Sequence, residues 1–398
     1  MRSWRRLVLT SALLVALCVG WLASSAFGGG SAPTTTSTPE PRGASFSAPA
    51  ATATAATLPG RLQTESVQGD SEDDPNPALA RGATSQAGAA TVGDIALLVG
   101  GLDPLRASIP NIARVDLRTG RSTVVGRLPR AMHDTAVTTL RGRALVMGGA
   151  FRNRIYGATY AVDGRGRVFE QGRLPHARAG AGAASAADGS FAVLAGGRQR
   201  NGPSIDVLRT VDGRTFETIG RLLHPVEHPG VVVADGAVWV VGGEVDGIPQ
   251  AFVQRVDLSS GTTVEGAPLP QALSAASVFV AGGSVFVAGG RTTSGRSNEI
   301  LHLDTRTAPP PVVETAPGAA PTTDAVVTPV PTVGVASFAG RLPTTRSDAA
   351  VVVSGDTATM IGGLVTYTRP QPKVHAGTTA APKLYDQATA TSVRITVT

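Results

Sequence analysis

Residues Gly126–Gly149 read GRLPRAMHDTAVTTLRGRALVMGG, and this stretch decides the fold. A turn at Gly126 and Pro129 leads into a short apolar run. Arg141 and Gly142 interrupt the run, and a second apolar run then ends in the pair Gly148-Gly149. Apolar runs that are separated by a tight turn and bounded by glycine and proline are typical of adjacent strands. The stretch therefore predicts two paired strands closed by a glycine pair.

The glycine pair recurs through the chain at the end of an apolar run. The pairs are Gly100-Gly101, Gly148-Gly149, Gly196-Gly197, Gly242-Gly243, Gly289-Gly290 and Gly362-Gly363. Their first glycines are 48, 48, 46, 47 and 73 residues apart. Four nearly equal steps and one long step indicate an internal repeat with one insertion, and a period in this range is typical of repeat architectures.

Two other features keep the same phase as the glycine pairs. The word GRLP begins at Gly126, Gly172 and Gly340, with the variants GRLL at Gly220 and GAPLP at Gly266. Downstream of each pair an apolar or aromatic residue precedes an aspartate that is expected to open a turn, at Asp116, Asp163, Asp212, Asp257, Asp304 and Asp386. Aspartate and nearby glycine are the residues that tight turns favour. Each unit is thus expected to contain four short strands.

Units of about 50 residues with four strands and a glycine pair resemble the kelch repeat, and six of them resemble a kelch-type β-propeller. The resemblance covers residues 79–398 and implies an all-β, six-bladed fold. It departs from the kelch pattern in lacking the usual aromatic residues, because the only tryptophan within the repeats is Trp239. Because the chain ends in SVRITVT (392–398), which is expected to be the outer strand of the sixth unit, we expect the ring to close without exchanging a strand between the termini.

The first 30 residues are expected to lie outside the fold. Arg2, Arg5 and Arg6 precede an uncharged apolar run from Leu7 to Ala26. This pattern is typical of a signal peptide, and the run is nearly long enough for a single membrane anchor with its arginines on the inside. Cleavage and retention are both compatible with the sequence. We therefore expect an exported protein that is either anchored in the membrane or secreted.

Residues 31–78 are rich in proline, threonine, serine and alanine, and a segment of this composition is expected to be a disordered spacer. One detail stands out, because residues 58–62 (LPGRL) repeat the GRLP motif in part; this segment is either a strand that docks on the first or last blade or a chance match. The long step in the repeat places a proline-rich insertion at about residues 307–332, and a second irregular loop follows Thr368. Prolines predict loops at these positions.

The formal net charge is +6, and every basic residue except Lys373 and Lys383 is an arginine. The arginines are scattered singly through the predicted turns and form no basic run, which is the pattern of a solvated surface. We therefore expect no nucleic-acid partner. The expected partners are an unidentified protein or cell-surface glycan, together with the membrane through the N-terminal segment.

The residues with the potential for chemistry lie just ahead of the predicted inner strands, which line the central channel of a propeller. Counting back from each glycine pair brings several of them to common positions at the channel mouth: Arg130, Arg178 and His224 at one position, Asp134, His228 and Asp348 at another, with His133, His176, Glu227 and Arg346 beside them. Such a ring has the donors for an anionic sugar or a divalent metal. The alternative is that the arginines and aspartates hold neighbouring blades together. We predict a ligand-binding mouth with no metal and no cofactor.

No reaction is indicated by the sequence. Galactose-oxidase-like propellers use a copper site with a Tyr–Cys crosslink. The single cysteine, Cys18, lies in the N-terminal segment, outside the repeats, so this chemistry is excluded. The turns that begin at Asp163 and Asp212 resemble sialidase turns, but such turns are structural, and no tyrosine nucleophile lies near the expected mouth. No nucleophile motif accompanies His133-Asp134 or Glu227-His228. We therefore expect a non-catalytic binding module or scaffold, with a carbohydrate- or cell-wall-active enzyme as the alternative.

Overall fold

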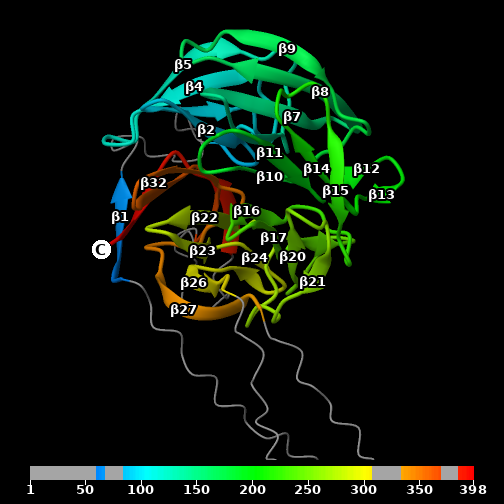
Figure 1. The fold of residues 1–398 in the computed structure, drawn as a ribbon. Coiled ribbons are helices and arrows are strands. Elements are labelled where there is room, and N and C mark those ends of the chain that lie inside the picture. Colours follow the sequence, from blue (N-terminus) through cyan, green and yellow to red (C-terminus); the bar gives the residue numbers. More distant parts are fainter. Residues whose placement is uncertain (1–59, 68–83, 307–332, 369–383) are drawn as a thin grey trace, which may run out of the picture. The chain divides into compact units, whose positions relative to one another are not determined.

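The computed structural model describes residues 60–67, 84–306, 333–368 and 384–398, and these residues form strands and turns. They belong to one compact unit, Thr54–Thr398. Six four-stranded antiparallel sheets, the blades, surround a common centre (Figure 1). The prediction of an all-β, six-bladed propeller is confirmed. The expected signal peptide or membrane anchor, most of the spacer, the insertion at 307–332 and most of the irregular loop that follows Thr368 lie outside the described residues. Within the described residues, no helix has the length and apolar character needed to cross a bilayer.

The first five blades each use four strands in chain order. They consist of β2 (Gly88–Val92), β3 (Ile95–Val99), β4 (Asn111–Val115) and β5 (Ser122–Arg127); β6 (Ala136–Leu140), β7 (Arg143–Phe151), β8 (Arg154–Val162) and β9 (Val168–Arg173); β10 (Gly182–Ser185), β11 (Ala192–Ala195), β14 (Asp206–Thr210) and β15 (Glu217–Arg221); β16 (Gly230–Ala234), β17 (Ala237–Val241), β20 (Val253–Asp257) and β21 (Thr263–Glu265); β22 (Ser277–Ala281), β23 (Ser284–Ala288), β26 (Glu299–Asp304) and β27 (Val335–Arg341).

The sixth blade closes the ring with a strand from the other end of the described chain. Its order is β28 (Ala350–Ser354), β29 (Thr357–Ile361), β32 (Ser392–Val397) and β1 (Leu62–Val67). The prediction that the ring closes without exchange is therefore wrong: β32 is the third strand, and β1 is the outermost. β1 also lies within the segment 31–78 that was expected to be a disordered spacer, and it pairs with β32 along its whole length, from Leu62 opposite Val397 to Val67 opposite Ser392.

The partial GRLP motif at residues 58–62 lies beside a docking strand, but it does not occupy the position that the motif has in the other blades. In the first blade the word stands at the end of the outer strand, where Arg127 pairs with Asn111. At residues 60–62 the word stands at the beginning of the outer strand, because Leu62 pairs with Val397 at the far end of β32. The positions are not equivalent, so the match in letters is a coincidence beside a real strand.

Hairpins stand between the second and third strands of the blades. Four of them form separate two-stranded sheets: β12 (Arg198–Gln199) with β13 (Gly202–Pro203), β18 (Glu244–Val245) with β19 (Ile248–Pro249), β24 (Arg291–Thr292) with β25 (Gly295–Arg296), and β30 (Leu364–Thr368) with β31 (Leu384–Ala388). The last pair corrects one expectation, because Asp386 lies in β31 and does not open a turn after a third strand. The turns at Asp116, Asp163, Asp212, Asp257 and Asp304 do follow third strands, and each carboxylate accepts backbone N–H groups of its turn.

The glycine pairs form the junctions between blades. The N–H of each second glycine donates to a carbonyl in the loop that precedes the next inner strand, over 2.7–2.9 Å; the acceptors, called here the junction residues, are Thr84, Met132, Arg178, Val226, Leu273 and Arg346. Both glycines of every pair have positive φ. A Cβ on the first glycine would lie 2.3–2.6 Å from the same carbonyl oxygen. The pair recurs because only glycine meets both conditions.

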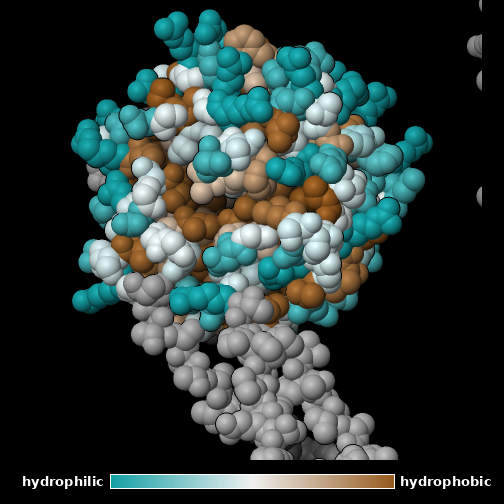
Figure 2. Space-filling view, in the orientation of Figure 1, coloured by the Kyte–Doolittle hydropathy of each residue, from teal (hydrophilic) through white to brown (hydrophobic). Residues whose placement is uncertain are grey.

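The core lies between the blades and consists of aliphatic and small side chains. Valine, alanine and leucine from facing sheets fill each interface, and Trp239 is fully buried between the fourth and fifth blades. Aliphatic and small side chains thus make up most of the interfaces, and a few aromatic residues, among them Phe279 and Phe286 between the fifth and sixth blades, are buried with them. The inner strands β2, β6, β10, β16, β22 and β28 contact one another in sequence and surround the channel. Figure 2 shows a hollow at the centre of the molecule, apolar at its base and surrounded by hydrophilic residues.

Candidate functional site at the channel mouth

A closed ring of backbone hydrogen bonds defines the channel mouth. It joins one residue from the loop before each inner strand, and each N–H donates to the carbonyl of the preceding blade over 2.7–3.1 Å; the members of this mouth ring are Gln86, Asp134, Gly180, His228, Ala275 and Asp348. All six have positive φ, between 50° and 61°. The backbone is thus the same in every blade, whereas the side chains differ. The mouth ring lines a shallow cavity of about 130 Å³.

The prediction that Asp134, His228 and Asp348 occupy equivalent positions agrees with this geometry. The same count placed Arg178 beside Arg130 and His224, and that register was wrong. In the third blade the β10–β11 turn is longer and shifts the count by two residues, so Gly180 corresponds to Asp134 and His228, and His176 corresponds to Arg130 and His224. Arg178 is therefore a junction residue, equivalent to Arg346.

The two junction arginines are structural. Arg178 is fully buried and its Nη1 donates to the carbonyls of Gly196 and Asp206, 3.2 and 3.1 Å away. Arg346 is buried equally and donates to the carbonyl and the hydroxyl of Thr391, each 2.8 Å away. Burial lowers the pKa of both guanidinium groups to about 10, so both stay charged at neutral pH. Each arginine joins strands within its own blade rather than lining the mouth.

Arg130 and His224 also turn away from the mouth ring, toward outer strands. The guanidinium of Arg130 lies over the ring of Tyr156 in β8, 4.7 Å from its centroid. The imidazole of His224 stacks on Phe252 at 4.1 Å, and its Nε2 lies 3.3 Å from a carboxylate oxygen of Glu265 in β21. His176 lies in the loop before β10, at the position that corresponds to Arg130 and His224. Of the predicted mouth residues, Asp134, His133, His228, Glu227 and Asp348 remain.

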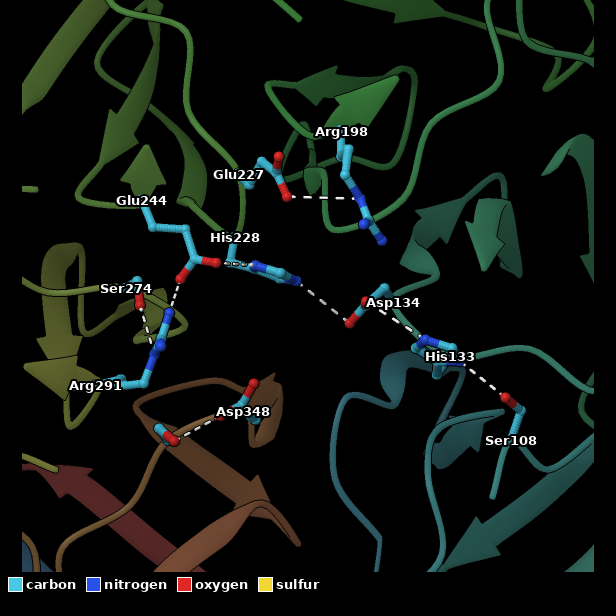
Figure 3. Close-up of polar contacts among 11 residues, drawn as sticks. Ser108, His133, Asp134, Arg198, Glu227, His228, Glu244, Ser274, Arg291 and Asp348 are labelled. Atoms are coloured by element: carbon cyan, nitrogen blue, oxygen red, sulfur yellow. Dashed lines mark hydrogen bonds and ion pairs between the residues drawn. The ribbon is translucent and has the colours of Figure 1, made fainter. Parts of the chain in front are cut away.

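These residues belong to a chain of polar contacts that crosses the mouth (Figure 3). Its centre is His228, whose Nε2 lies 3.4 Å from Asp134 Oδ1 and whose Nδ1 lies 3.2 Å from Glu244 Oε1. Glu244 is also ion-paired with Arg291, and the Nε of Arg291 donates to Ser274 Oγ over 3.2 Å. This series of polar contacts thus connects loops of the second, fourth and fifth blades. We call Asp134, His228, Glu244 and Arg291 the mouth chain.

The mouth chain alternates in charge. Burial, the largest influence, lowers the pKa of His228, but its hydrogen bonds and ion pairs with Asp134 and Glu244 outweigh burial and raise the pKa well above its ordinary value. Burial raises the pKa of Glu244, but the contacts with His228 and Arg291 outweigh it and lower the pKa to about 2. His228 is therefore an imidazolium between two carboxylates at neutral pH.

Gly180 lets His228 reach across the third blade. A Cβ at Gly180 would lie 2.6 Å from Nε2 of His228, inside any allowed contact. The imidazole therefore occupies the space above Gly180 on its way from the fourth blade to Asp134 in the second. The one glycine of the mouth ring is explained by the side chain that crosses it.

His133 extends the mouth chain toward the first blade. Its Nε2 lies 3.8 Å from Asp134 Oδ2, and its Nδ1 lies 2.8 Å from the hydroxyl of Ser108. Burial is the main cause that lowers the pKa of His133 below its ordinary value, so this imidazole is neutral at neutral pH. The two neighbouring histidines thus differ in charge.

Two carboxylates lie beside the mouth chain. Glu227 is 3.7 Å from Arg198, and burial raises its pKa. Asp348 stands apart from the mouth chain and accepts a hydrogen bond from Ser347 Oγ over 2.6 Å (Figure 3).

Metal ligation at this site would compete with contacts already formed. Glu227, His228 and Glu244 each offer one ligand atom within 4.8 Å of the others. However, Arg291 pairs with Glu244, Arg198 lies beside Glu227, and His228 is held charged. A cation would have to displace a guanidinium and a proton, because metal ligands must be deprotonated. The donor set therefore favours a polar organic ligand over a metal.

Ser108, Glu244 and Arg291 were not among the residues predicted from the sequence. Glu244 and Arg291 share a signal, because each directly follows a glycine pair, as Arg198 does. This position forms an isolated β-bridge with the residue just before the mouth ring, as in Glu227 with Glu244 and Ser274 with Arg291. Counting one residue forward from each pair would have found them. Ser108 lies in an irregular loop and carries no such signal.

Comparison with known proteins supports the fold. No family model matches the chain, and no curated protein sequence matches it. Among solved structures, that of YjhT, a kelch-repeat protein, is similar with a TM-score of 0.56 and 13% sequence identity, over 77% of this chain and 97% of that chain. At this identity the similarity concerns the fold alone. The chain is a six-bladed β-propeller similar in structure to the kelch-repeat protein YjhT.

Proposed function

We propose that this protein is an exported, non-catalytic binding module of the kelch type that takes a polar ligand at the channel mouth, most directly a group of a cell-surface glycan. The observation that carries the proposal is the mouth chain. Its charges alternate and are fixed by mutual contacts around a central cavity, which is the arrangement that orients a ligand rich in hydroxyl groups. A segment of a partner protein is the other ligand that such a mouth accommodates.

The size of the cavity agrees with a terminal group rather than a whole ligand. A cavity of about 130 Å³ lies below the usual range for sites that enclose a small molecule. The hairpins between second and third strands supply further surface, including the exposed side chain of Ile248 at the tip of the β18–β19 hairpin. We infer that the mouth holds one end of the ligand and the hairpins contact the remainder. Export rests on the N-terminal segment, either cleaved or retained as an anchor.

A specific contact favours a second candidate, a carbohydrate- or cell-wall-active enzyme. His133 is neutral and lies 2.8 Å from the hydroxyl of Ser108, so the pair has the distance and the protonation state of a base beside a hydroxyl group. The other histidine, His228, is already protonated and held by two carboxylates, so it does not accept a proton at neutral pH. The enzyme candidate therefore depends on His133.

The two candidates separate in one experiment on residues 54–398, the compact unit that contains all six blades. The melting temperature is measured with a panel of cell-surface mono- and oligosaccharides, and the same mixtures are analysed for turnover. His228→Gln, His133→Ala and the distant control Arg165→Gln are compared with the parent. A binding module gives a ligand-dependent rise that His228→Gln loses and Arg165→Gln keeps, without turnover. Turnover that His133→Ala abolishes while the thermal shift remains would favour the enzyme.

A further inference from the structure

A second cavity lies on the face opposite the mouth, between the second and third blades. It has a volume of about 440 Å³, and its lining comes from β6, β7 and the turn between them, from β8 and β9, and from the β14–β15 turn. Turns between first and second strands lie at the far end of the inner strands from the mouth ring, which places this cavity away from the mouth chain. Its size is within the range of sites that hold a small organic molecule. We call it the arginine pocket.

The lining combines an apolar base with three arginines. Leu140, Leu145 and Ala161 are buried and supply the apolar part. The arginines are Arg141, Arg143 and Arg214, all exposed. Within the described part of the chain, none of the three forms an ion pair with a carboxylate. Arg143 lies over the ring of Phe169, 5.1 Å from its centroid, and Nε of Arg214 lies 3.4 Å from Gln171 Oε1.

The one carboxylate of the pocket is turned to its own loop. Asp212 accepts hydrogen bonds from the backbone N–H groups of Arg214 and Thr215, over 2.8 and 2.9 Å, and from the Thr215 hydroxyl. These bonds, with that to Thr215 first, lower the pKa of Asp212 to about 2, so it stays charged. Its oxygens are thus occupied by neutral donors, and the pocket keeps a net positive charge of three arginines against one aspartate.

The walls of the pocket are held in place by contacts between the blades. The hydroxyl of Thr159, which is fully buried, donates to the carbonyl of Gly213 over 2.7 Å. A Cβ at Gly213 would lie 2.7 Å from a methyl group of Leu145, so the turn that carries Asp212 and Arg214 rests directly on the second blade. The backbone N–H of Arg141 donates to Gly189 of the third blade over 3.0 Å. The arginines therefore project from a preformed frame.

We propose that the arginine pocket binds a small organic oxyanion, in which a carboxylate or phosphate group contacts the guanidinium groups and the body of the ligand packs on Leu140, Leu145 and Ala161. Guanidinium groups form charge-assisted, frequently bidentate hydrogen bonds with both kinds of oxyanion. The apolar base distinguishes this pocket from a site for a free inorganic ion, which has no surface to place there. This inference is independent of the function proposed for the mouth.

Isothermal titration of residues 54–398 with four compounds tests the proposal: glucuronate, glucose 6-phosphate, inorganic phosphate and neutral glucose. Arg143→Gln/Arg214→Gln is compared with Arg118→Gln/Arg165→Gln, which removes the same charge from turns elsewhere on that face. We expect glucuronate or glucose 6-phosphate to bind, inorganic phosphate to bind more weakly, and glucose not to bind. The pocket variant should weaken binding by at least about tenfold.

The other outcomes of the titration either support or overturn the proposed oxyanion site. Binding of glucuronate alone or of glucose 6-phosphate alone supports the proposal and identifies the acid group. Equal binding of glucose, or an equal loss in the Arg118→Gln/Arg165→Gln control, would overturn it, because the arginines would then contribute no local contact. Absence of binding by both organic acids also overturns it. Circular dichroism of both double variants verifies that the exposed substitutions leave the fold unchanged.

Discussion

The junction residues and the mouth ring lie two positions apart in the same six loops, yet they differ in how they use the sequence. At the junctions the backbone carbonyl accepts the same hydrogen bond in every blade, and the glycine pair that donates it recurs six times. At the mouth ring the backbone is again the same, but the side chains run from Gly180 and Ala275 to His228 and Asp348. The fold is specified where the repeat agrees, and the chemistry lies where it diverges.

The largest expected effect comes from breaking the frame at the sixth blade. A chain that starts at residue 79 lacks β1, so β32 loses its outer neighbour and the core loses Val67 and the side of Leu62 that packs on it. We expect the free energy of unfolding to fall by at least about 3 kcal/mol relative to a chain that starts at residue 54, because a six-residue ladder and buried apolar area are lost. Urea denaturation of both chains measures the difference. Equal stability would mean that β1 is not part of the sixth blade.

A smaller but still large loss is expected at a single junction. In Gly289→Ala the new Cβ lies 2.3 Å from the carbonyl oxygen of Arg346, at a φ of 65°. Strain of this kind costs about 1–3 kcal/mol before the neighbouring backbone shifts. The control is Gly283→Ala, at a φ of 70° in the β22–β23 turn, where a Cβ meets no atom within 4 Å. Denaturation should show a clearly greater loss for Gly289→Ala, and similar losses would remove the steric explanation of the pair.

Arg346 is a junction residue and Asp348 belongs to the mouth ring, so substitutions at these two positions compare the two sets of residues within one loop. Arg346→Met leaves the carbonyl and hydroxyl of Thr391 without their buried donor and should cost about 1–3 kcal/mol. Asp348→Asn keeps the shape of a partly buried mouth residue and should cost less than about 1 kcal/mol. Chemical denaturation of the two variants measures both values. A larger loss of stability for Asp348→Asn than for Arg346→Met would contradict the structural role of the junction residue.

The pH dependence of stability is expected to show the smallest effect, through His228. Because the folded pKa of His228 lies above its unfolded value, its contribution is fully present below pH 6.5 and is lost as the pH rises through the folded pKa. Glu244 acts in the opposite direction: its folded pKa of about 2 lies below the unfolded 4.5, so its contribution is lost as the pH falls from 4.5 toward 2. The stability difference between the parent and His228→Gln should thus be greatest between about pH 4.5 and 6.5.

Urea denaturation from pH 4.5 to 10 measures that difference, with Arg165→Gln as the distant control. Arg165 is exposed in the turn that follows β8, away from the mouth ring, so its substitution should give no such maximum. A difference that grows as the pH rises above 6.5 would contradict the charged state assigned to His228.

The sequence predicted much of the frame because the frame is periodic. Glycine pairs and turn aspartates mark backbone geometry that only a few residue types satisfy, so six blades follow from counting. The closing strand could not be predicted in this way, because β1 (LQTESV) lies outside the repeat, and its place depends on a ladder with residues more than 300 positions away.

The candidate site was predicted in part for the same reason. Asp134, His228 and Asp348 were found because the count from the glycine pair holds in their blades. Arg178 was misplaced because a turn in its blade is two residues longer, and Ser108 could not be found because it lies in an irregular loop. Which charges pair across the mouth depends on side-chain reach, such as that of His228 over Gly180, and no periodicity encodes it.

The mouth chain and the proposed binding function both depend on the charge of His228. The measurement is a titration of the imidazole ¹⁵N resonances of residues 54–398, with His228→Gln used to assign the signals. We expect both ring nitrogens of His228 to remain protonated through neutral pH, with a pKa well above 6.5, while His133 titrates below 6.5. A His228 that becomes neutral at or below pH 6.5 would contradict the mouth chain and the function inferred from it.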